Sequence, residues 1–175
     1  WFYPSEVDIR YDDKGHPIGA TAKADGSAVM LGGIEKMSKS KNNVVEPKDI
    51  IAKFGADTAR VFVMFAGPPD QSAAWSDSGA AGCFRFLSRL RGTAQKMAPA
   101  LKHAAGEITG ASKGALTLRR EMHILLRQVT LDYERLQYNT VVSGAMKMLN
   151  AIEGATFADT PADAAVRREA LSILL

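Results

Sequence analysis

Residues 36–43 read KMSKSKNN, and Pro47 follows shortly after them. Two ammonium groups, each a compact charge with three donors, and two rotatable hydroxyls thereby share one short loop. The methionine between them is able to anchor the loop to an apolar core. We therefore predict a loop that binds phosphate groups through Lys36, Met37, Ser38, Lys39 and Ser40. For an isolated cluster of lysine and serine, a solvated surface loop is the alternative.

Two short helices are predicted directly after this loop. Pro47 suits the first position of a helix that runs to Phe54, and Gly55 ends that helix. The run 56–66 is nearly all apolar at its centre, which predicts a second and largely buried helix. Asp57 and Arg60 on the second helix form either a structural cap and ion pair or a support for the loop.

The loop and the sequence after it resemble the class I aminoacyl-tRNA synthetases, and within that class the leucyl-tRNA synthetases of bacteria. In these enzymes a loop of this sequence closes over the triphosphate of ATP. The stretch from Gly55 to Leu87 matches the leucyl pattern better than the isoleucyl, valyl or methionyl patterns. The resemblance covers nearly the whole chain.

The resemblance implies a leucine–tRNA ligase, which activates leucine with ATP and Mg²⁺ and transfers it to tRNA(Leu). Lys36 and Lys39 are expected to act as catalytic residues that stabilise charge on the departing phosphates, and Lys39 is the stronger candidate. One alternative is the same role in a valyl-, isoleucyl- or methionyl-tRNA synthetase, because the pocket that selects the side chain lies outside this sequence. Another alternative is a free-standing helical RNA-binding module.

The chain is expected to be the C-terminal part of such an enzyme. It has no glycine-rich turn of a Rossmann half and no editing domain, so the fragment alone is predicted to be inactive. The predicted fold is mainly α with a small antiparallel β appendage. Four segments are expected: a leucine-specific-domain-like β insertion (1–34), the signature loop with stem-contact-like supporting helices (35–98), a linker (99–114) and part of an anticodon-binding helical bundle (115–175).

Residues 6–31 alternate between apolar and polar side chains in three short runs. Turns are expected at residues 12–15 and 24–26, which predicts a three-stranded antiparallel meander. The meander is either a structural appendage or a tRNA contact.

A long amphipathic helix is predicted from about Asp77 to Met97. Its apolar stripe contains Cys83, the only cysteine of the chain, which is expected to be a small core side chain. Its other face is basic and either follows a phosphate backbone or is simply solvated. The basic residues of that face are Arg85, Arg89, Arg91 and Lys96.

Three amphipathic helices are predicted after the linker. His123 is expected in the core of the first, and Asn139 is expected to cap the second. The predicted core stripes are Leu116, His123, Leu126, Val129 and Tyr133, then Val142, Ala145, Met146, Leu149 and Ile152, and then Val166, Ala170, Ile173 and Leu174. The candidate tRNA-binding residues are Arg85, Arg89, Arg119, Arg120 and Arg127.

The composition is consistent with a polyanionic partner. The net charge is +3 and the isoelectric point is about 9.0. A single cysteine excludes an intrachain disulfide and a cysteine-based metal site, and we expect no metal site in this chain. The sequence contains no signal peptide and no apolar run of membrane-spanning length, so a cytoplasmic protein without a membrane partner is expected.

Overall fold

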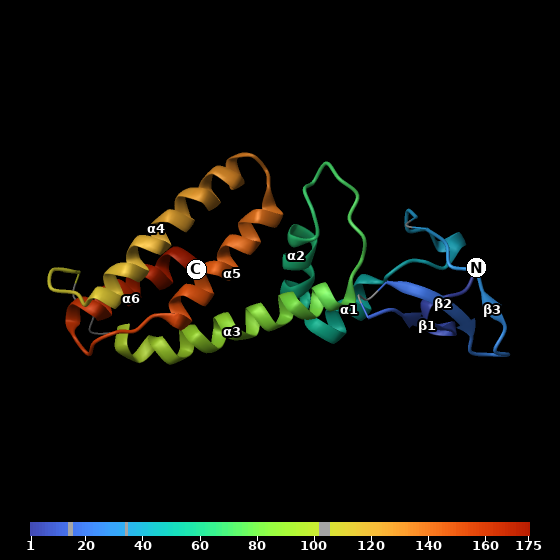
Figure 1. Ribbon diagram of the computed structural model, residues 1–175, viewed down its shortest axis with the longest axis horizontal. Helices are drawn as coiled ribbons and strands as arrows, with labels where there is room; N and C mark the ends of the chain where they lie inside the picture. The colour runs from blue at the N-terminus through green and yellow to red at the C-terminus, as the bar shows by residue number, and fades with distance from the viewer. Residues whose placement is uncertain (14–15, 34, 102–105) are drawn as a thin grey trace. The chain divides into compact units, whose positions relative to one another are not determined.

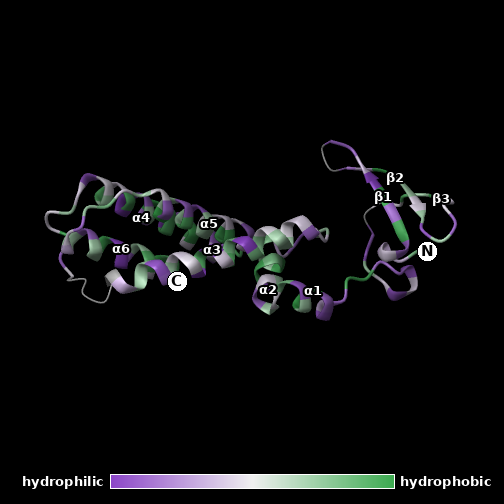
Figure 2. Cartoon of the chain, turned by 90° about the horizontal axis from the view of Figure 1, so that it is seen from below, coloured by the Kyte–Doolittle hydropathy of each residue, from purple (hydrophilic) through white to green (hydrophobic). Residues whose placement is uncertain are grey.

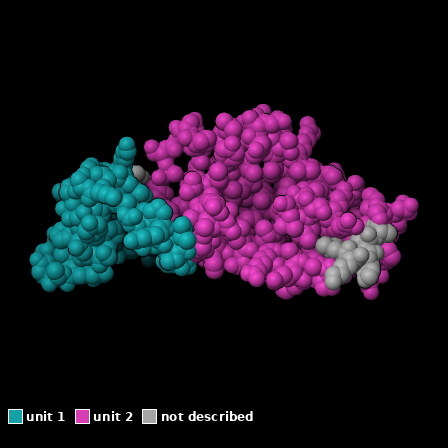
Figure 3. Space-filling view, turned by 180° about the vertical axis from the view of Figure 1, so that it is seen from behind, with its two compact units in different colours: residues 1–53 teal, residues 54–175 magenta. Residues whose placement is uncertain are grey.

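The computed structural model describes residues 1–13, 16–33, 35–101 and 106–175 (Figure 1). The fold is mainly helical with one small antiparallel sheet, which confirms the predicted fold class at this level. The chain divides into two compact units, Trp1–Lys53 and Phe54–Leu175, which are coloured separately in Figure 3. Each unit is described by itself.

The first unit contains a three-stranded meander in the order β1-β2-β3. A short 3-10 turn, η1 (Pro4–Glu6), leads into β1 (Val7–Tyr11), which pairs antiparallel with β2 (Pro17–Ala22), and β3 (Ala28–Val29) completes the sheet. The predicted meander is therefore confirmed, although residues 14–15 of its first turn lie outside the described residues. After the sheet come a second 3-10 turn, η2 (Lys39–Lys41), and the helix α1 (Pro47–Phe54).

The second unit is built from five helices in the described residues: α2 (Ala56–Phe65), α3 (Asp77–Leu101), α4 (Lys113–Glu134), α5 (Tyr138–Gly154) and α6 (Pro161–Leu174). Helices α4, α5 and α6 pack on one another, and α3 contacts α2, α5 and α6. Figure 2 shows apolar residues gathered where these helices face one another. Two clusters of buried side chains hold the unit together.

The smaller cluster joins α2 to α3. Phe62, Ala80 and Cys83 are buried in it, and the ring of Trp75 meets that of Phe62 edge-on with centroids 4.7 Å apart. Cys83 is the small core side chain that the sequence predicted, and burial raises the pKa of its thiol. The larger cluster joins the last three helices through Leu118, Met122, Met148, Ile152 and Ala170.

Both ends of the predicted linker are helical in the structure. Helix α3 continues through Pro99 to Leu101, and α4 begins at Lys113 after the N-cap Ser112. Pro99 has no N–H to donate to the carbonyl four residues earlier, and only two helical residues follow it before α3 ends. The described part of the connection is 106–112, and residues 102–105 of the predicted linker lie outside the described residues.

The predicted core stripe of α4 was wrong at three of its five residues, whereas Leu126 and Val129 pack against the larger cluster as predicted. Leu116 and Tyr133 are 47% and 61% exposed, and the side chain of His123 is 45% exposed. The buried residues are Ala115, Leu118 and Met122. A second set of apolar residues at helical spacing exists on this helix, and the packing of α5 and α6 selects between the two. The predicted cap is also wrong, because α5 begins at Tyr138, with Gln137 as its N-cap and Asn139 inside the helix.

A buried carboxylate ties the helix ends of the second unit together. Asp163, in the first turn of α6, is fully buried. Its oxygens accept hydrogen bonds from the backbone N–H of Ser112 (2.7 Å), the Ser112 hydroxyl (2.6 Å) and the backbone N–H of Ala158 (2.6 Å). The Ser112 hydroxyl, more than any other donor, lowers the pKa of Asp163 below its ordinary value, against the opposing effect of burial.

Candidate functional site

The five residues predicted to bind phosphate lie on one exposed loop of the first unit. Lys39–Lys41 form the 3-10 turn η2, closed by hydrogen bonds from the Lys41 N–H to the Ser38 carbonyl (3.1 Å) and from the Asn42 N–H to the Lys39 carbonyl (3.2 Å). The side chains of Lys36 and Lys39 are exposed. Within the described part of the chain, neither ammonium group is paired with a carboxylate, so both are available to an anion.

The two hydroxyls of the loop lie side by side. The Ser38 and Ser40 Oγ atoms are 2.7 Å apart, so one hydroxyl donates to the other. The hydroxyl that donates keeps lone pairs only, and the hydroxyl that accepts has its own hydrogen left for a ligand oxygen. One hydroxyl donor and two ammonium groups are thus presented on the same loop.

The third lysine of the loop differs from the other two. The Lys41 ammonium forms an ion pair with the carboxylate of Glu35, and it also lies over the Trp1 ring, 5.2 Å from the ring centroid. Its charge is therefore already compensated. The sequence shows three similar lysines, and only the structure separates the engaged one from the two available ones.

Met37 does not anchor the loop in the way that was predicted. Its side chain is 43% exposed, so it is not seated in a core. The loop is held instead by the side chain of Asn43: its Oδ1 accepts from the Ser38 N–H (2.7 Å) and its Nδ2 donates to the Lys36 carbonyl (3.3 Å). A polar clamp replaces the apolar anchor because a loop leaves backbone N–H and C=O groups unpaired. A side-chain amide is able to accept from the first and donate to the second.

Two of the predicted RNA-binding arginines are engaged within the protein. Arg89 on α3 donates to Asn150 Oδ1 (2.7 Å) and to the carboxylate of Glu153, and the hydrogen bond to Glu153 lowers the pKa of the Glu153 carboxyl. Arg119 on α4 donates to both oxygens of Glu169 on α6 (2.6 and 3.1 Å), and this lowers the pKa of the Glu169 carboxyl. Both arginines therefore join helices.

His123 shares the carboxylate of Glu169 with Arg119. Its Nε2 lies 2.9 Å from Glu169 Oε1, and its ring is half exposed, so it is a surface histidine with a polar partner. The prediction of a core position for His123 was wrong. The prediction that its ring has a hydrogen-bond partner within the protein is confirmed. Among the described residues, no group of three histidine, cysteine or acidic side chains is arranged to hold a metal ion.

Arg120 and Arg127 are exposed on α4, two helical turns apart. With Leu116 and Ile124, which is 59% exposed, they line a shallow hollow on the helix that also includes Arg119 and His123. The structure thus brings together the three arginines predicted on this helix. Arg85 is exposed on α3, and Asp57 and Arg60 form the predicted ion pair on α2, with Arg60 Nη1 2.9 Å from Asp57 Oδ1.

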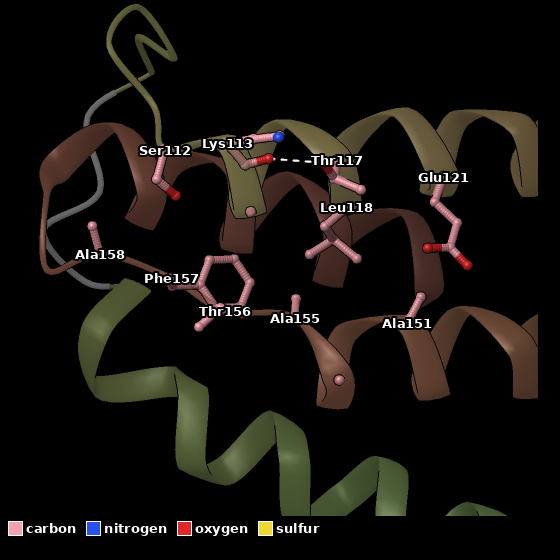
Figure 4. A pocket seen from close by; sticks show the side chains of 12 residues that line it. Ser112, Lys113, Thr117, Leu118, Glu121, Ala151, Ala155, Thr156, Phe157 and Ala158 are labelled. Atoms are coloured by element: carbon pink, nitrogen blue, oxygen red, sulfur yellow. Dashed lines mark hydrogen bonds between the residues drawn. The ribbon is translucent and has the colours of Figure 1, made fainter.

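A second hollow lies between the start of α4 and the end of α5 (Figure 4). Lys113, Thr117, Glu121 and Phe157 are among its lining residues, and the Thr117 hydroxyl donates to the Lys113 carbonyl (2.8 Å). None of the predicted site residues lines it. In the described part of the chain, no helix combines the length and the apolar character that crossing a membrane requires.

Comparison with known proteins identifies similar sequences for the whole chain. Residues 27–76 match the family model described as "tRNA synthetases class I (I, L, M and V)". The leucine–tRNA ligase of Methylibium petroleiphilum is 69% identical over 175 residues, which is 100% of this chain and 20% of that protein. The leucine–tRNA ligase of Ralstonia nicotianae is 55% identical over 177 residues, again 100% of this chain and 20% of that protein.

A solved structure has the same fold. The crystal structure of the LeuRS-tRNA-LeuAMS ternary complex of Agrobacterium radiobacter K84 matches 79% of this chain and 18% of its own, with a TM-score of 0.66 and 24% identity. The chain therefore spans about a fifth of the length of the relatives that it matches.

Proposed function

Because this chain is homologous over its whole length to a part of the leucine–tRNA ligases, we propose that it is the segment of such an enzyme that carries the ATP-binding loop and tRNA-binding helices. The identity of 69% through all 175 residues, the loop included, is the observation that carries the proposal. We assign the loop with α1, α2 and α3 to the part that supports catalysis. Helices α4, α5 and α6 are assigned to the start of the anticodon-binding bundle.

The proposed reaction has two steps, and the loop acts in the first. An oxygen of the leucine carboxylate forms a bond to the α-phosphorus of ATP, and the bond from that phosphorus to the bridging oxygen breaks, so pyrophosphate leaves. Negative charge grows on the leaving group as this bond breaks. The available ammonium groups of Lys36 and Lys39 would stabilise that charge, and Mg²⁺ accompanying the nucleotide would shield it further. In the second step a hydroxyl oxygen of the terminal ribose of tRNA(Leu) forms a bond to the leucyl carbonyl carbon, the bond from that carbon to the phosphate oxygen breaks, and AMP leaves.

Amino-acid-dependent ATP–pyrophosphate exchange by the full-length protein tests this proposal. We expect exchange to be fastest with leucine, and slower with isoleucine, valine and methionine by about a hundredfold, the scale on which an apolar pocket separates similar side chains. Preference for one of the other three would move the assignment to a sister enzyme. Absence of exchange with all four would favour a helical RNA-binding module.

The exposed face of α4 is the proposed tRNA contact. Arg120 and Arg127 are unpaired with any carboxylate in the described residues, whereas Arg119 is held by Glu169. Two cations and two apolar side chains on one helix face suit phosphates and sugars, and this mode of binding depends strongly on salt.

Replacing Arg120 and Arg127 together by alanine is expected to raise the KM for tRNA roughly tenfold. The fall of log affinity with log salt should become less steep, with the magnitude of the slope smaller by about 2. Leucine-dependent exchange without tRNA should not change. The measurement is aminoacylation at several salt concentrations, with Lys147→Ala, an exposed cation on α5, as the matched control. An unchanged KM and salt slope would remove this face from the proposed interface.

A further inference from the structure

We propose that Asn43 is a positioning residue for the activation step, acting through the backbone of the loop that carries Lys36 and Lys39. This inference rests on the proposed function, because it names a further residue that the same loop needs. Asn43 lies outside the five residues predicted to bind ATP. It is assigned here from its hydrogen bonds, which join the two ends of the loop.

The two hydrogen bonds of Asn43 have complementary directions. Oδ1 accepts from the N–H of Ser38, and Nδ2 donates to the carbonyl of Lys36, so one side chain satisfies one donor and one acceptor on either side of Met37. Ser38 is the N-cap of η2, with extended backbone angles and no side-chain cap of its own. The clamp therefore fixes the point from which the turn with Lys39 begins.

Asn42 turns the chain so that this contact is possible. It adopts the left-handed conformation, with φ of 51°, which asparagine tolerates better than most residues. Its Nδ2 donates to the Trp1 carbonyl (3.3 Å), which ties this turn to the start of the chain. After this turn, the side chain of Asn43 lies against the residues that precede η2.

The clamp matters because the segment before η2, which carries Lys36, has few other hydrogen bonds among the described residues. Lys36, Met37 and Lys39 are exposed, and among the described residues Glu35 and Lys41 form the one ion pair across the loop. A free loop would lose much conformational entropy on binding ATP, and its charges would often be misplaced when the reaction begins. A loop that is ordered before ATP binds loses less conformational entropy on binding. More of the interaction energy between the loop and ATP then stabilises the transition state.

Asn43→Ala in the full-length enzyme is expected to lower kcat for leucine-dependent exchange about tenfold, with the KM for leucine unchanged. If Asn43 acts through Lys39, the same substitution in a Lys39→Ala background should cost less than about twofold, because interacting residues are not additive. Asn139→Ala is the matched control, since the Asn139 Oδ1 has no hydrogen-bond partner among the described residues, and it should stay within about twofold of the unmodified enzyme.

Trypsin cleavage after Lys36 and Lys39 tests the clamp without reference to the reaction. Cleavage of Asn43→Ala should be about tenfold faster than cleavage of the unmodified protein or of Asn139→Ala, because an unclamped loop opens more often. Faster cleavage with unchanged exchange would overturn the positioning role and leave the proposed function standing. Equal cleavage would overturn the clamp itself. An unmodified protein without leucine-dependent exchange would overturn the proposed function and the role assigned within it.

Discussion

Replacing Lys39 by alanine in the full-length enzyme is expected to lower leucine-dependent ATP–pyrophosphate exchange about a hundredfold, or about 3 kcal/mol in the barrier. Lys39 begins the turn η2, it is exposed, and it is unpaired with any carboxylate in the described residues. Its ammonium group is therefore free to meet the pyrophosphate as charge develops there. Removing an interaction that is stronger in the transition state than in the ground state lowers kcat.

The three lysines of the loop provide the internal comparison. Lys41→Ala should cost less than tenfold, because the Lys41 ammonium is already paired with Glu35 and lies over the Trp1 ring. Lys36→Ala should fall between the other two. Steady-state exchange measured over a range of ATP and leucine concentrations separates effects on kcat from effects on KM. Equal losses at all three positions would indicate a general loss of positive charge and would contradict a specific role for Lys39.

Local sequence signals were sufficient for the elements around the loop. Alternating side chains between turns predicted the meander, and Pro47 and Gly55 marked the boundary between two helices that the structure places at Pro47–Phe54 and Ala56–Phe65. These signals act between residues that are close in sequence. Tertiary contacts have little influence on them.

The errors concern choices that only tertiary packing makes. Helix α4 has apolar residues on more than one face, so the sequence alone did not decide between Leu116 and Leu118 as the buried residue. The partners of Arg89 and Arg119 lie on other helices, 50 or more residues away in sequence, so their engagement was not visible either. Asn43 had a local signal, since an amide shortly after a polar loop is able to bridge donors and acceptors, but many residues share that signal.

Asp163, with its buried carboxylate, is expected to be the residue of the second unit at which substitution lowers stability most. Asp163→Ala should lower the thermal unfolding midpoint of the chain by roughly 10 °C, because it leaves the N–H groups of Ser112 and Ala158 and the Ser112 hydroxyl without their acceptor. Asp163→Asn should lower it less. An amide retains one acceptor and the Ser112 hydroxyl is able to reorient, but the Ala158 N–H faces a donor if the NH₂ group takes that position. Circular dichroism during heating measures the midpoint.

The pH dependence of this effect follows from the direction of the pKa shift. The pKa of Asp163 is lowered in the folded state, so the folded protein favours the ionised carboxylate more than the unfolded chain does. The stabilisation is therefore complete above the ordinary value of 3.8 and is lost as the pH falls through the lower folded-state pKa. The difference in midpoint between the unmodified chain and Asp163→Asn should be constant from about pH 5 to 8 and should narrow below about pH 4. Asp159→Asn, at an exposed carboxylate just before α6, is the matched control and should show little difference at any pH. A difference that stays constant into acid would mean that Asp163 stabilises the helix ends by its shape alone and not by its charge.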